Sequence, residues 1–503
     1  MQLEHWQNRA VSYLIEAAAR GFPQAVASNL SCSVHSAAIS EQMLLISDAA
    51  HSSDRDAGCA STALRTASDA EFTSLTLSSL PALTAPPMKI IMHEMATYGQ
   101  NQQLAKALAS RGHDIIYAYC PSFLTPSRSS THFSPAEGVT AVRVELGAEF
   151  TKRNFLKRFL QERAYGTKMA AMMASLRPDL IISGNTPIEV QSIIQKMCRR
   201  LNTPFVLWMH DVYSTGVKSV LARAPLIGDL VAQRYALLEH SVARRSEGIV
   251  TISADFRDLI AHWGVDADRV TVVENWGVVP SGALPRKDND WAARHGLLGK
   301  RVLLYSGTLG FKHNPQVLLD LASEFRDDPD VRVVVISEGY GAEWLSLRRK
   351  EFPGLVVLPF QSEEDFQNAL AAADILIAIL EPEAAKFSVP GKVLSYMSAG
   401  KPILGAISEE NLAARTVLAA SAGMIADPTD PGALRKLARL LVDDKNRCLK
   451  LGTAALDYAR TNFEIGAIAR RFEDVFYRAV ERGTDSRTRI VGDAARPLPE
   501  QIT

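Results

Sequence analysis

The spacing of apolar side chains changes at residue 88. Residues 1–87 contain no lysine and are rich in serine and alanine, and only residues 8–20 have the apolar spacing of a short helix. From Met88 onward, short runs of consecutive apolar residues alternate with helical patterns. Continuous Val/Ile-rich runs between helices predict a parallel sheet that is covered on both faces.

The alternation occurs in two series, which predict two doubly wound α/β domains. The first series contains the predicted strands Lys89–Met92, Asp114–Tyr119, Leu180–Ile182, Phe205–Met209, Gly248–Ile252 and Val270–Val273, with a helix over Asn101–Arg111. After a loop-like segment, Ser281–Lys300, the second series contains Arg301–Tyr305, Val331–Ile336, Leu355–Leu358, Ile375–Ile379, Pro402–Leu404 and Gly423–Ala426. Ligands of such sheets bind beyond the carboxyl ends of the strands, so both domains should contribute loops to a cleft between them.

The chain therefore divides into five predicted segments. Residues 1–87 are expected to be a disordered leader or upstream sequence from a misassigned start, since so few large apolar side chains cannot offset the entropy of ordering; a species-specific tail is the alternative. The first domain is assigned to 88–280 and the second to 281–465. The sequence of Phe463–Tyr477 has the pattern of an amphipathic helix, and the segment 466–482 is expected to form a helix that crosses back to the first domain. A frayed tail, 483–503, is expected to follow.

Composition limits the possible functions. The 55 basic and 55 acidic residues give a formal net charge of zero, which excludes a global basic field for nucleic acid. The five cysteines lie far apart without a C-x-x-C pair, which argues against a disulfide framework or zinc knuckle and is typical of a reducing cytosol. No run of about 20 apolar residues, the length that spans a bilayer, occurs.

The second domain begins with a strand, a glycine-rich turn and a helix start, over residues 303–315. Its glycines, among them Gly307, let the backbone approach an anion, amides at the helix start can donate to it, and Lys312 adds a positive charge. The turn is not a Walker A sequence. An ordinary turn without a ligand remains the alternative for so short a motif.

A second motif, PGKVLSYMSAGKP, occupies residues 390–402. Pro390 suits the entry of a helix, and the amides of Gly391, Lys392 and Val393 would then be free donors at the positive end of the helix dipole. A plain helix of an α/β unit explains the apolar positions of this segment. It does not explain the Pro-Gly-Lys entry.

Together these residues resemble the retaining glycosyltransferases of family 4, which have the GT-B fold. The resemblance covers about residues 88–480 and is strongest for the subgroup of colanic-acid and other exopolysaccharide biosynthesis, whose signature is P-S-K-x-x-x-Y-M-A-A-G-K/R-P. It implies two Rossmann-like domains that face a cleft. It also implies a cytoplasmic enzyme at the inner face of the plasma membrane, with a nucleotide diphosphate sugar as co-substrate and no other cofactor.

The resemblance also implies which residues form the site. Lys312 and Lys392 should bind the diphosphate, and His210 should face the sugar and the acceptor. The remaining donor-binding residues would be Gly307, Thr308, Glu338, Gly339, Gly341, Phe360, Pro390, Gly391 and Ser395. Gly99 and Asp211 would lie on the acceptor side. For His210, a polar group satisfied at a strand end is the alternative.

Two departures from the family pattern affect these assignments. Many members carry a pair of glutamates eight residues apart around the donor sugar, whereas this chain has Phe387 and Ser395 there; Glu381 or Glu383 is a possible substitute. The usual glycine pair after the first strand is replaced by residues 95–100, where only Gly99 remains. Acceptor recognition should differ accordingly.

The expected chemistry follows from charge. Cleavage of a sugar–phosphate bond produces an oxocarbenium-like centre and a charged leaving group, which preorganised amides and the two lysines would stabilise. This arrangement needs no metal, and no D-x-D motif lies in a convincing loop. If the acceptor hydroxyl attacks on the face that the nucleotide leaves, configuration is retained without a protein nucleophile.

A basic segment, TKRNFLKRFLQERAYGTK at 151–168, suggests contact with a membrane. Its basic residues outnumber its single acid, Glu162, and Phe155, Leu156, Phe159 and Leu160 recur at helical spacing. A basic amphipathic helix fits the surface of a bilayer that carries a lipid-linked acceptor. The alternative is a solvated helix whose apolar side packs on its own domain.

Other functions remain open. A catalytically degenerate nucleotide-sugar-binding subunit would explain the missing glutamate pair, but the retained lysines and glycine turns argue against it. A nucleotide-sugar epimerase shares the architecture, but its acidic and histidine residues are not evident. A nicotinamide oxidoreductase is disfavoured because no G-x-G-x-x-G follows the first strand.

Overall fold

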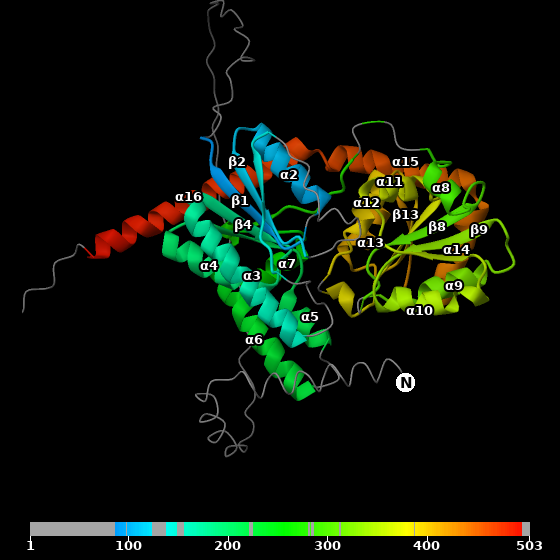
Figure 1. Cartoon of the computed structure of the whole chain (residues 1–503), viewed down its shortest axis with the longest axis horizontal. Helices are drawn as coiled ribbons and strands as arrows, with labels where there is room; N and C mark the ends of the chain where they lie inside the picture. Colours follow the sequence, from blue (N-terminus) through cyan, green and yellow to red (C-terminus); the bar gives the residue numbers. More distant parts are fainter. Residues whose placement is uncertain are drawn as a thin grey trace, which may run out of the picture. The chain divides into compact units, whose positions relative to one another are not determined.

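The described part of the chain folds into two parallel α/β domains. The computed structural model describes residues 86–96, 98–122, 137–147, 155–220, 225–279, 282, 286–310, 313–386 and 388–494. Within them, strands and helices alternate, and the strands form two separate sheets (Figure 1). The predicted fold class, two Rossmann-like domains, is confirmed. The leader predicted for 1–87 lies outside the described residues up to residue 85.

Seven of the described strands form the first sheet, in the order β3-β2-β1-β4-β5-β6-β7 with parallel pairing. They are β1 (Lys89–Glu94), β2 (Asp114–Tyr119), β3 (Val139–Arg143), β4 (Leu180–Gly184), β5 (Phe205–Met209), β6 (Gly248–Thr251) and β7 (Val270–Val272). Most positions of β1, β2, β4, β5 and β6 are buried. The chain runs outward from β1 in one direction and then returns to start again at β4 on its other side.

The helices of this half follow the strands in chain order. They are α2 (Gly99–Ser110), α3 (Phe155–Leu176), α4 (Ile188–Leu201), α5 (Tyr213–Val220), α6 (Pro225–Arg244) and α7 (Asp255–His262), with a 3-10 turn at Ala267–Arg269. The core side of α3 carries Tyr165, Met169 and Met173, which are fully buried. Their spacing of about four residues places them on one face of the helix.

The second sheet repeats the same winding in the order β10-β9-β8-β11-β12-β13, again in parallel. Its strands are β8 (Arg301–Ser306), β9 (Val331–Ile336), β10 (Leu355–Leu358), β11 (Ile375–Ile379), β12 (Ile403–Ala406) and β13 (Gly423–Ala426). Its helices are α8 (Asp290–Arg294), α9 (Gln316–Glu324), α10 (Tyr340–Arg348), α11 (Glu363–Ala372), α12 (Lys392–Ser398), α13 (Leu412–Ala419), α14 (Pro431–Asp443) and α15 (Lys445–Asn462), with 3-10 turns at Arg349–Glu351 and Ala384–Lys386.

Side-chain caps fix where several of these helices begin. Ser362 accepts a hydrogen bond from the amide of Asp365, and Asn411 accepts one from Ala413. Asp430 does the same for α14, whose first residue is Pro431. Each cap satisfies one of the amides that have no partner inside the helix, and proline at the first position has no amide to satisfy.

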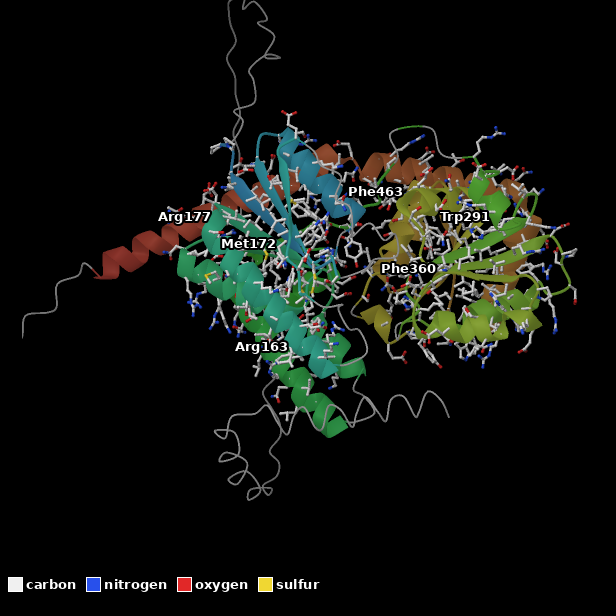
Figure 2. The ribbon with its side chains drawn as sticks, in the orientation of Figure 1. Arg163, Met172, Arg177, Trp291, Phe360 and Phe463 are labelled. Atoms are coloured by element: carbon white, nitrogen blue, oxygen red, sulfur yellow. The ribbon has the colours of Figure 1, made fainter. Side chains whose placement is uncertain are left out.

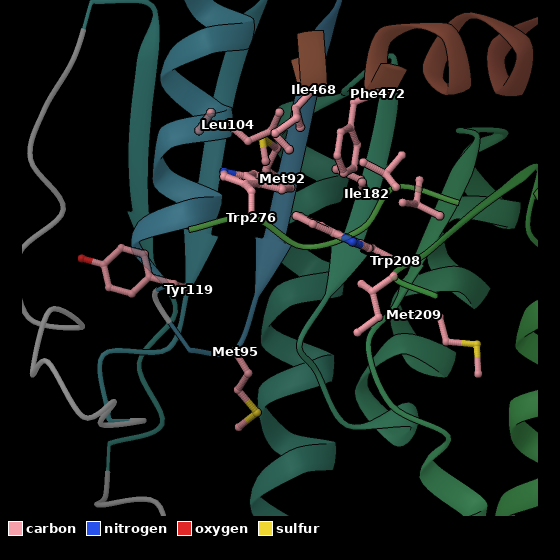
Figure 3. Close-up of a cluster of buried hydrophobic side chains, with 14 of the residues drawn as sticks. Met92, Met95, Leu104, Tyr119, Ile182, Trp208, Met209, Trp276, Ile468 and Phe472 are labelled. Atoms are coloured by element: carbon pink, nitrogen blue, oxygen red, sulfur yellow. The ribbon is translucent and has the colours of Figure 1, made fainter. Parts of the chain in front are cut away.

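The last helix, α16 (Ile465–Ala494), packs against the first sheet and α2. Phe472 of α16 contacts the ring of Trp208 edge-on at 4.9 Å between centroids, and Trp276 stacks on Trp208 at 6.1 Å (Figure 3). All three side chains are buried. An aromatic cluster of this kind adds about 0.5–1.5 kcal/mol per ring pair to the burial of apolar area.

Hydrogen bonds to Glu473 also hold α16 against the end of α2 and the start of the first sheet. The guanidinium of Arg111, at the end of α2, donates to Oε1 of Glu473 at 2.7 Å, and Nε2 of the buried His113 contacts that oxygen at 3.1 Å. Nδ1 of His113 accepts from the amide of Met88 at 3.1 Å, so Nε2 carries the proton and donates. Glu473 thus joins α16 to the start of the first sheet.

The strand predictions are confirmed residue for residue at β2, β5, β9, β10, β11 and β13. Three expectations were wrong. Strand β3 was missed because only Val139 is buried on this edge strand. The linker Ser281–Lys300 contains α8, which Asn289 caps. The helix expected over 466–482 continues to Ala494, so most of the expected tail 483–503 is helical as far as it is described.

None of the described helices is both long and apolar enough to cross a bilayer.

The Glu473 junction generates the first prediction. Desolvation alone would raise the pKa of Glu473, but the hydrogen bonds from Arg111 and His113 outweigh it and lower the pKa. Stability from this carboxylate is therefore present above its ordinary pKa of 4.5 and lost as the pH falls below it. We expect Glu473→Gln to lower the opening free energy of α16 by about 1–2 kcal/mol at neutral pH, so that hydrogen exchange in the helix is roughly 5–30 times faster.

The difference between Glu473→Gln and the wild type should shrink as the pH is lowered below 4.5 and the wild-type carboxyl becomes protonated. Glu481→Gln is the control, because Glu481 lies on the same helix and is exposed. Equal exchange of α16 in the wild type and Glu473→Gln at neutral pH would show that the junction does not hold the helix.

Candidate functional site

Each sheet has one position where the strand order reverses, between β1 and β4 in the first sheet and between β8 and β11 in the second. The loops that leave the two neighbouring strands at such a point diverge and form a crevice at the carboxyl ends. In the second sheet, Gly307 follows β8 at this point. In the first sheet, Glu94 ends β1 and Gly184 ends β4.

Gly307 touches Lys392, the first residue of α12. Gly307 has φ +138°, a conformation that other residues rarely adopt, and its amide donates to the carbonyl of Ile336 at 3.0 Å. A Cβ at this position would lie 2.8 Å from Nζ of Lys392. Glycine is therefore favoured here by its backbone angle, and an added Cβ would force the end of the Lys392 side chain to move. The structure thus brings together two residues that the sequence analysis took from separate motifs.

The ammonium group of Lys392 is buried in an unusual way. Nζ lies 3.8 Å from the centroid of the Tyr305 ring, and among the described residues no hydrogen-bond acceptor contacts it. Desolvation lowers the pKa of Lys392 to about 7. The aromatic face favours the charged form, but it leaves the three N–H donors unsatisfied. Such a group is poised to gain an anionic partner.

Tyr396 fixes the helix that carries Lys392. Its hydroxyl accepts from the amide of Ser306 at 3.0 Å and donates to the carbonyl of Ser306 at 3.2 Å. This pair of bonds ties α12 to the last residue of β8. The sequence analysis did not assign a role to Tyr396, although its spacing of four residues from Lys392 on one helix places both on the same face.

The amides at the start of α12 differ from the prediction. The amide of Val393 donates to the carbonyl of Pro390 at 3.2 Å, so the expectation that it would be a free donor was wrong. Pro390 is buried, whereas Gly391 is exposed, and a Cβ added at Gly391 would meet no atom within 4 Å. The open backbone at Gly391 leaves the approach to the helix start unobstructed.

The helix start predicted at the end of 303–315 is confirmed, because α9 follows Pro315 directly, but its first amides are already in use. Helix α9 begins at Gln316, and Oδ1 of Asn314 already accepts from the amide of Gln316 at 3.0 Å. The exposed Thr308 supplies a carbonyl that accepts from the hydroxyl of Tyr305 at 3.3 Å. Lys312 lies outside the described residues.

A second glycine-rich turn, Glu338–Gly341, packs against the first. Ser337 Oγ accepts from the amide of Leu309 at 3.1 Å, and the amide of Gly341 donates to the carbonyl of Leu309 at 3.3 Å. A Cβ at Gly341 would lie 2.6 Å from Cβ of Leu309, and Gly339 has φ +95°. The two turns are therefore joined at the carboxyl ends of β8 and β9.

The other predicted donor residues have less open surroundings. Phe360 is only 4% exposed and belongs to the apolar core, so its ring lies among core side chains rather than on an open surface (Figure 2). Ser395 is half-buried on α12. Phe387 lies outside the described residues. Glu381 follows β11 and is half-buried; desolvation and then the neighbouring Glu383 raise the pKa of its carboxyl.

The first domain has a cavity of about 210 Å³ at the carboxyl ends of β4 and β5. Side chains from α3, α4, α5 and α6 contribute to its walls, and both His210 and Asp211 line it, as do Tyr98, Arg158, Asn185, Thr186, Pro187, Ile188, Gln191, Leu207, Trp208, Met209, Tyr213 and Glu239. Gly99 is exposed at the first position of α2 and is not among the lining residues. The preceding residue, Tyr98, lines the cavity instead.

His210 is held as a neutral imidazole. Nδ1 contacts the carbonyl of Trp208 at 3.2 Å, and Nε2 is buried without a hydrogen-bond partner among the described residues. Desolvation lowers the pKa of His210 to about 4, although the contact with Trp208 opposes this. The amide of Asn185 also donates to Nδ1 at 3.4 Å, so the two contacts of Nδ1 favour opposite tautomers: Nε2 is an acceptor if Nδ1–H donates to Trp208 and a donor if Nδ1 accepts from Asn185. The alternative of a fully satisfied polar group therefore does not describe Nε2.

Glu94 forms a buried polar cluster beside this cavity that the sequence analysis missed. Its carboxyl accepts from the amide of Tyr98 at 3.0 Å, from Nδ2 of Asn101 at 2.6 Å, and from the hydroxyl of Tyr117. Desolvation raises the pKa of Glu94 to about 8, against the effect of these hydrogen bonds. An acidic residue that ends a buried strand at the switch point was the available signal.

The predicted basic segment is described only in part. Residues 151–154, which include Lys152 and Arg153, lie outside the described residues, and 155–168 form the first part of α3. Glu162 is buried and accepts from Nε of Arg158 at 2.7 Å. The ring of Phe159 lies between two guanidinium groups, those of Arg163 at 5.6 Å and Arg234 at 5.7 Å.

Among the described residues, no group of three or more His, Cys, Asp or Glu side chains is arranged to hold a metal ion.

Two doubly wound parallel sheets of this strand order, in one chain, define the GT-B architecture. Solved structures with this fold include HepE from Anabaena in complex with UDP-glucose, with a TM-score of 0.55, 15% identity, and coverage of 78% of this chain and 99% of that chain. The sucrose-phosphate synthase of Thermosynechococcus elongatus gives a TM-score of 0.60 at 15% identity, covering 77% and 98%. WaaG, a glycosyltransferase involved in lipopolysaccharide biosynthesis, gives 0.56 at 16%, covering 77% and 99%.

The sequence matches agree with this architecture. Residues 100–276 match the glycosyl transferase 4-like domain and residues 300–444 match glycosyl transferases group 1. Two glycosyltransferase family models thus match consecutive parts of this chain, one in each α/β domain. It is 24% identical to WbjE of Pseudomonas aeruginosa, named as a glycosyltransferase, over 52% of this chain and 65% of that protein. It is 22% identical to WcaI of Escherichia coli, named as a colanic acid biosynthesis glycosyl transferase, over 59% and 76%.

The contact between Gly307 and Lys392 generates the second prediction. A methyl group at Gly307 must displace the ammonium of Lys392 from the Tyr305 ring toward solvent. We expect Gly307→Ala to move the pKa of Lys392 from about 7 toward its ordinary value of 10.5. NMR titration of ¹³C-methylated lysines measures it directly.

Gly310→Ala is the matched control, because Gly310 lies in the same turn and has no atom within 4 Å of an added Cβ. Its Lys392 signal should titrate as in the wild type. A wild-type Lys392 that titrates near 10.5 would contradict the described burial.

Proposed function

We propose that this protein transfers a hexosyl unit from a nucleotide diphosphate sugar to a lipid-linked saccharide or polysaccharide acceptor, with retention of configuration and without a metal ion. The observation that carries the proposal is the buried ammonium of Lys392, without a hydrogen-bond acceptor among the described residues, beside Gly307 at the switch point of the second sheet. The solved relative HepE was crystallised with UDP-glucose, which supports a donor of this chemistry.

The diphosphate would bind between the start of α12 and the turn at Gly307. Lys392 would donate from its ammonium, and the open backbone at Gly391 gives an oxygen access to the helix start. Lys312, which lies outside the described residues and follows Gly307 in the sequence motif, is proposed to add a second positive charge. A fixed cation in a poorly solvated site stabilises a charged leaving group more strongly than it would in water.

The nucleotide would lie toward the joined turns. Glu338, Gly339 and Gly341 form the second of these turns, and Thr308 belongs to the first. Phe360, being buried, would support the nucleotide pocket from within the core rather than stack on the base. Pro390 and Ser395 would shape the two ends of the α12 entry.

Transfer with retention would proceed on one face of the donor sugar. The bond between the anomeric carbon and the phosphate oxygen breaks, its electron pair leaves with the diphosphate, and the acceptor oxygen forms the new bond from the same side. The acceptor proton passes to the departing phosphate oxygen. Neither a protein nucleophile nor a glutamate pair is needed, which is consistent with Ser395 at one of the two positions.

His210 would act at the sugar side of this step. Its buried Nε2 has no partner among the described residues and can form a hydrogen bond with a sugar hydroxyl while the ring stays neutral, because burial depresses the pKa of His210 to about 4. Asp211 would contact the acceptor, and Gly99 would give it room at the start of α2. These three residues would position the substrates, whereas Lys312 and Lys392 would stabilise the negative charge of the leaving diphosphate.

Contact with a membrane is part of the proposal. Leu160 of α3 is 58% exposed, and Leu230 and Leu237 of α6 are 54% and 62% exposed. Arg163 and Arg234 belong to the same two helices, and the guanidinium groups of both contact the ring of Phe159. Exposed leucines next to basic side chains favour binding to an anionic bilayer, such as the inner face of the plasma membrane.

The central prediction of this function concerns Lys392. We expect the wild type to hydrolyse or transfer the sugar of at least one UDP- or GDP-sugar, and Lys392→Ala to reduce the rate at least about a hundredfold, as loss of a fixed charge at a leaving group does. Release of nucleotide measures it. Lys436→Ala, an exposed lysine of α14, is the control and should retain full activity.

Nucleotide binding by the wild type with no turnover on any sugar donor or acceptor would favour the binding subunit instead. Interconversion of two nucleotide sugars without transfer would favour the epimerase.

Membrane contact gives a separate prediction. We expect Leu160→Ser with Leu237→Ser to weaken binding to vesicles of anionic lipid at least about threefold, because two exposed apolar contacts are lost. Co-sedimentation with vesicles measures it. Leu347→Ser is the control, since Leu347 is 79% exposed but lies on α10 in the other domain. If the double variant binds vesicles as well as the wild type does, these leucines do not contact the membrane.

A further inference from the structure

Glu94 lies where the first sheet reverses its strand order, and it contacts both loops that diverge there. Its carboxyl accepts from the amide of Tyr98, in the loop after β1, at 3.0 Å, and from Nδ2 of Asn185, in the loop after β4, at 3.5 Å. The side chain is buried. One buried carboxyl therefore has partners on the two segments that lead to α2 and α4.

A second set of hydrogen bonds joins the same two loops. The amide of Met95 donates to Oγ1 of Thr186 at 3.1 Å, and that hydroxyl donates to the carbonyl of Gly184 at 2.6 Å. Asn185 has φ +45°, a left-handed conformation that asparagine tolerates better than most residues. The loop after β4 is thus held from outside itself in a conformation that costs energy.

The joined loops form part of the cavity that contains His210. Tyr98, Asn185 and Thr186 line this cavity, whereas Glu94 lies behind them. The amide of Asn185 also donates to Nδ1 of His210 at 3.4 Å, so the contacts extend to the segment after β5. A change at Glu94 therefore reaches residues of the cavity wall without altering the wall itself.

Two opposing influences act on the proton of Glu94. Desolvation favours the neutral carboxyl and is the larger, so the pKa rises to about 8 although the hydrogen bonds from Tyr98, Asn101 and Asn185 favour the carboxylate. The buried Oδ1 of Asn101 has no hydrogen-bond partner among the described residues. It can accept from the protonated carboxyl once that amide turns over.

Other titratable groups surround Glu94. They are His93 on its own strand, Tyr98 in the loop after β1, Tyr117 on β2, Tyr165 on α3 and Asp211 after β5. Desolvation lowers the pKa of His93 to about 3 and raises the pKa values of Tyr98 and Tyr165. These three groups therefore keep their charge state between pH 4.5 and 8, the range over which Glu94 differs from a carboxyl in water.

We propose that Glu94 is a positioning residue that couples the loop after β1 to the loop after β4, so that the two loops are held as one unit and loosen together when the carboxyl loses its proton. The coupling gains its role in sugar transfer from the proposed function, which it deepens, because the cavity lined by these loops then faces the acceptor. The residue acts through Tyr98 and Asn185 and does not itself contact a substrate.

The sign of the pH dependence follows from burial. Closed loops hold the proton of Glu94 more tightly than opened loops do, because in the opened state the carboxyl meets water. The contribution of this proton to closure is therefore fully present below pH 4.5 and is lost as the pH rises to about 8. A neutral side chain of the same shape at position 94 should remove this dependence and keep the loops closed.

Hydrogen exchange of the full chain, followed by mass spectrometry, tests the coupling. Protection factors, corrected for the intrinsic effect of pH, are compared for residues 98–104 and 184–190 at about pH 6 and about pH 8.5. We expect both segments of the wild type to lose protection at least about tenfold at the higher pH. In Glu94→Gln, both should stay protected and change less than about twofold.

A variant that removes the carboxyl tests the coupling itself. Glu94→Met deprives several buried donors of their acceptor and should lower the protection of both segments at least about fivefold already at about pH 6. Thr186→Val removes the acceptor of the Met95 amide and leaves Glu94 intact, so it should also loosen both segments.

Glu247→Gln is the matched control. The carboxyl of Glu247 also accepts from a backbone amide, that of Phe205 at 2.8 Å, but this contact lies at the amino end of β5. Both segments should exchange in this variant as they do in the wild type. Helix α9, in the second domain, is the internal reference and should exchange equally in all proteins.

The proposal is overturned if Glu94→Met loosens one segment and not the other, or if Glu94→Gln loses protection with rising pH as the wild type does. If Glu94→Met unfolds as a whole, Thr186→Val decides. Loss of protection at 98–104 as well as 184–190 then supports the coupling, and loss confined to 184–190 overturns it.

The measurement needs no substrate, so it separates this inference from the proposed function. Independent responses of the two segments would contradict the coupling and leave the transferase standing. Joint responses in a protein that turns over no nucleotide sugar would contradict the transferase and leave the coupling standing.

Discussion

The structure depends on one geometric constraint: parallel strands all end at the same edge of their sheet. At the point where the strand order reverses, the loops on either side diverge, and side chains far apart in the sequence meet there. In the second domain this brings Gly307, after β8, against Lys392 of α12. Tyr396 then holds α12 to the end of β8 through both the amide and the carbonyl of Ser306.

Two buried ionisable groups at the switch points have opposite surroundings. Glu94 in the first domain accepts several hydrogen bonds from the protein, so it organises the chain around it. Lys392 in the second domain has only an aromatic face as a partner among the described residues. A buried ionisable group whose hydrogen bonds are made stabilises local structure, whereas one whose hydrogen bonds are not made costs stability, which a bound ligand can restore. This contrast indicates that Glu94 holds the structure around its site, whereas Lys392 is available to bind a ligand.

Much of the fold follows from the sequence because parallel strands are buried on both faces. Runs such as Ile375–Ile379 and Phe205–Met209 are therefore apolar throughout and are located residue for residue. The edge strand β3 has one buried residue, so its pattern carries no comparable signal. Lys392 was identified from its motif. The partners of Glu94 could not be identified from the sequence. Tyr98, Asn101 and Tyr117 contact it only because β1 pairs with β2 and α2 begins beside them. Phe360 was assigned to donor binding from the resemblance, but its burial could not be foreseen, since an aromatic side chain in a loop looks the same in sequence whether it binds a base or fills the core.

The central claim is that the buried ammonium of Lys392 binds a diphosphate, and calorimetry of UDP binding in buffers of different ionisation enthalpy tests it most directly. At about pH 8 a lysine with a pKa of about 7 is mostly neutral, and an anionic partner raises that pKa. Binding of UDP should therefore take up close to one proton in the wild type and none in Lys392→Met. Equal proton uptake by both proteins, or tight binding by the wild type with no uptake, would contradict the account.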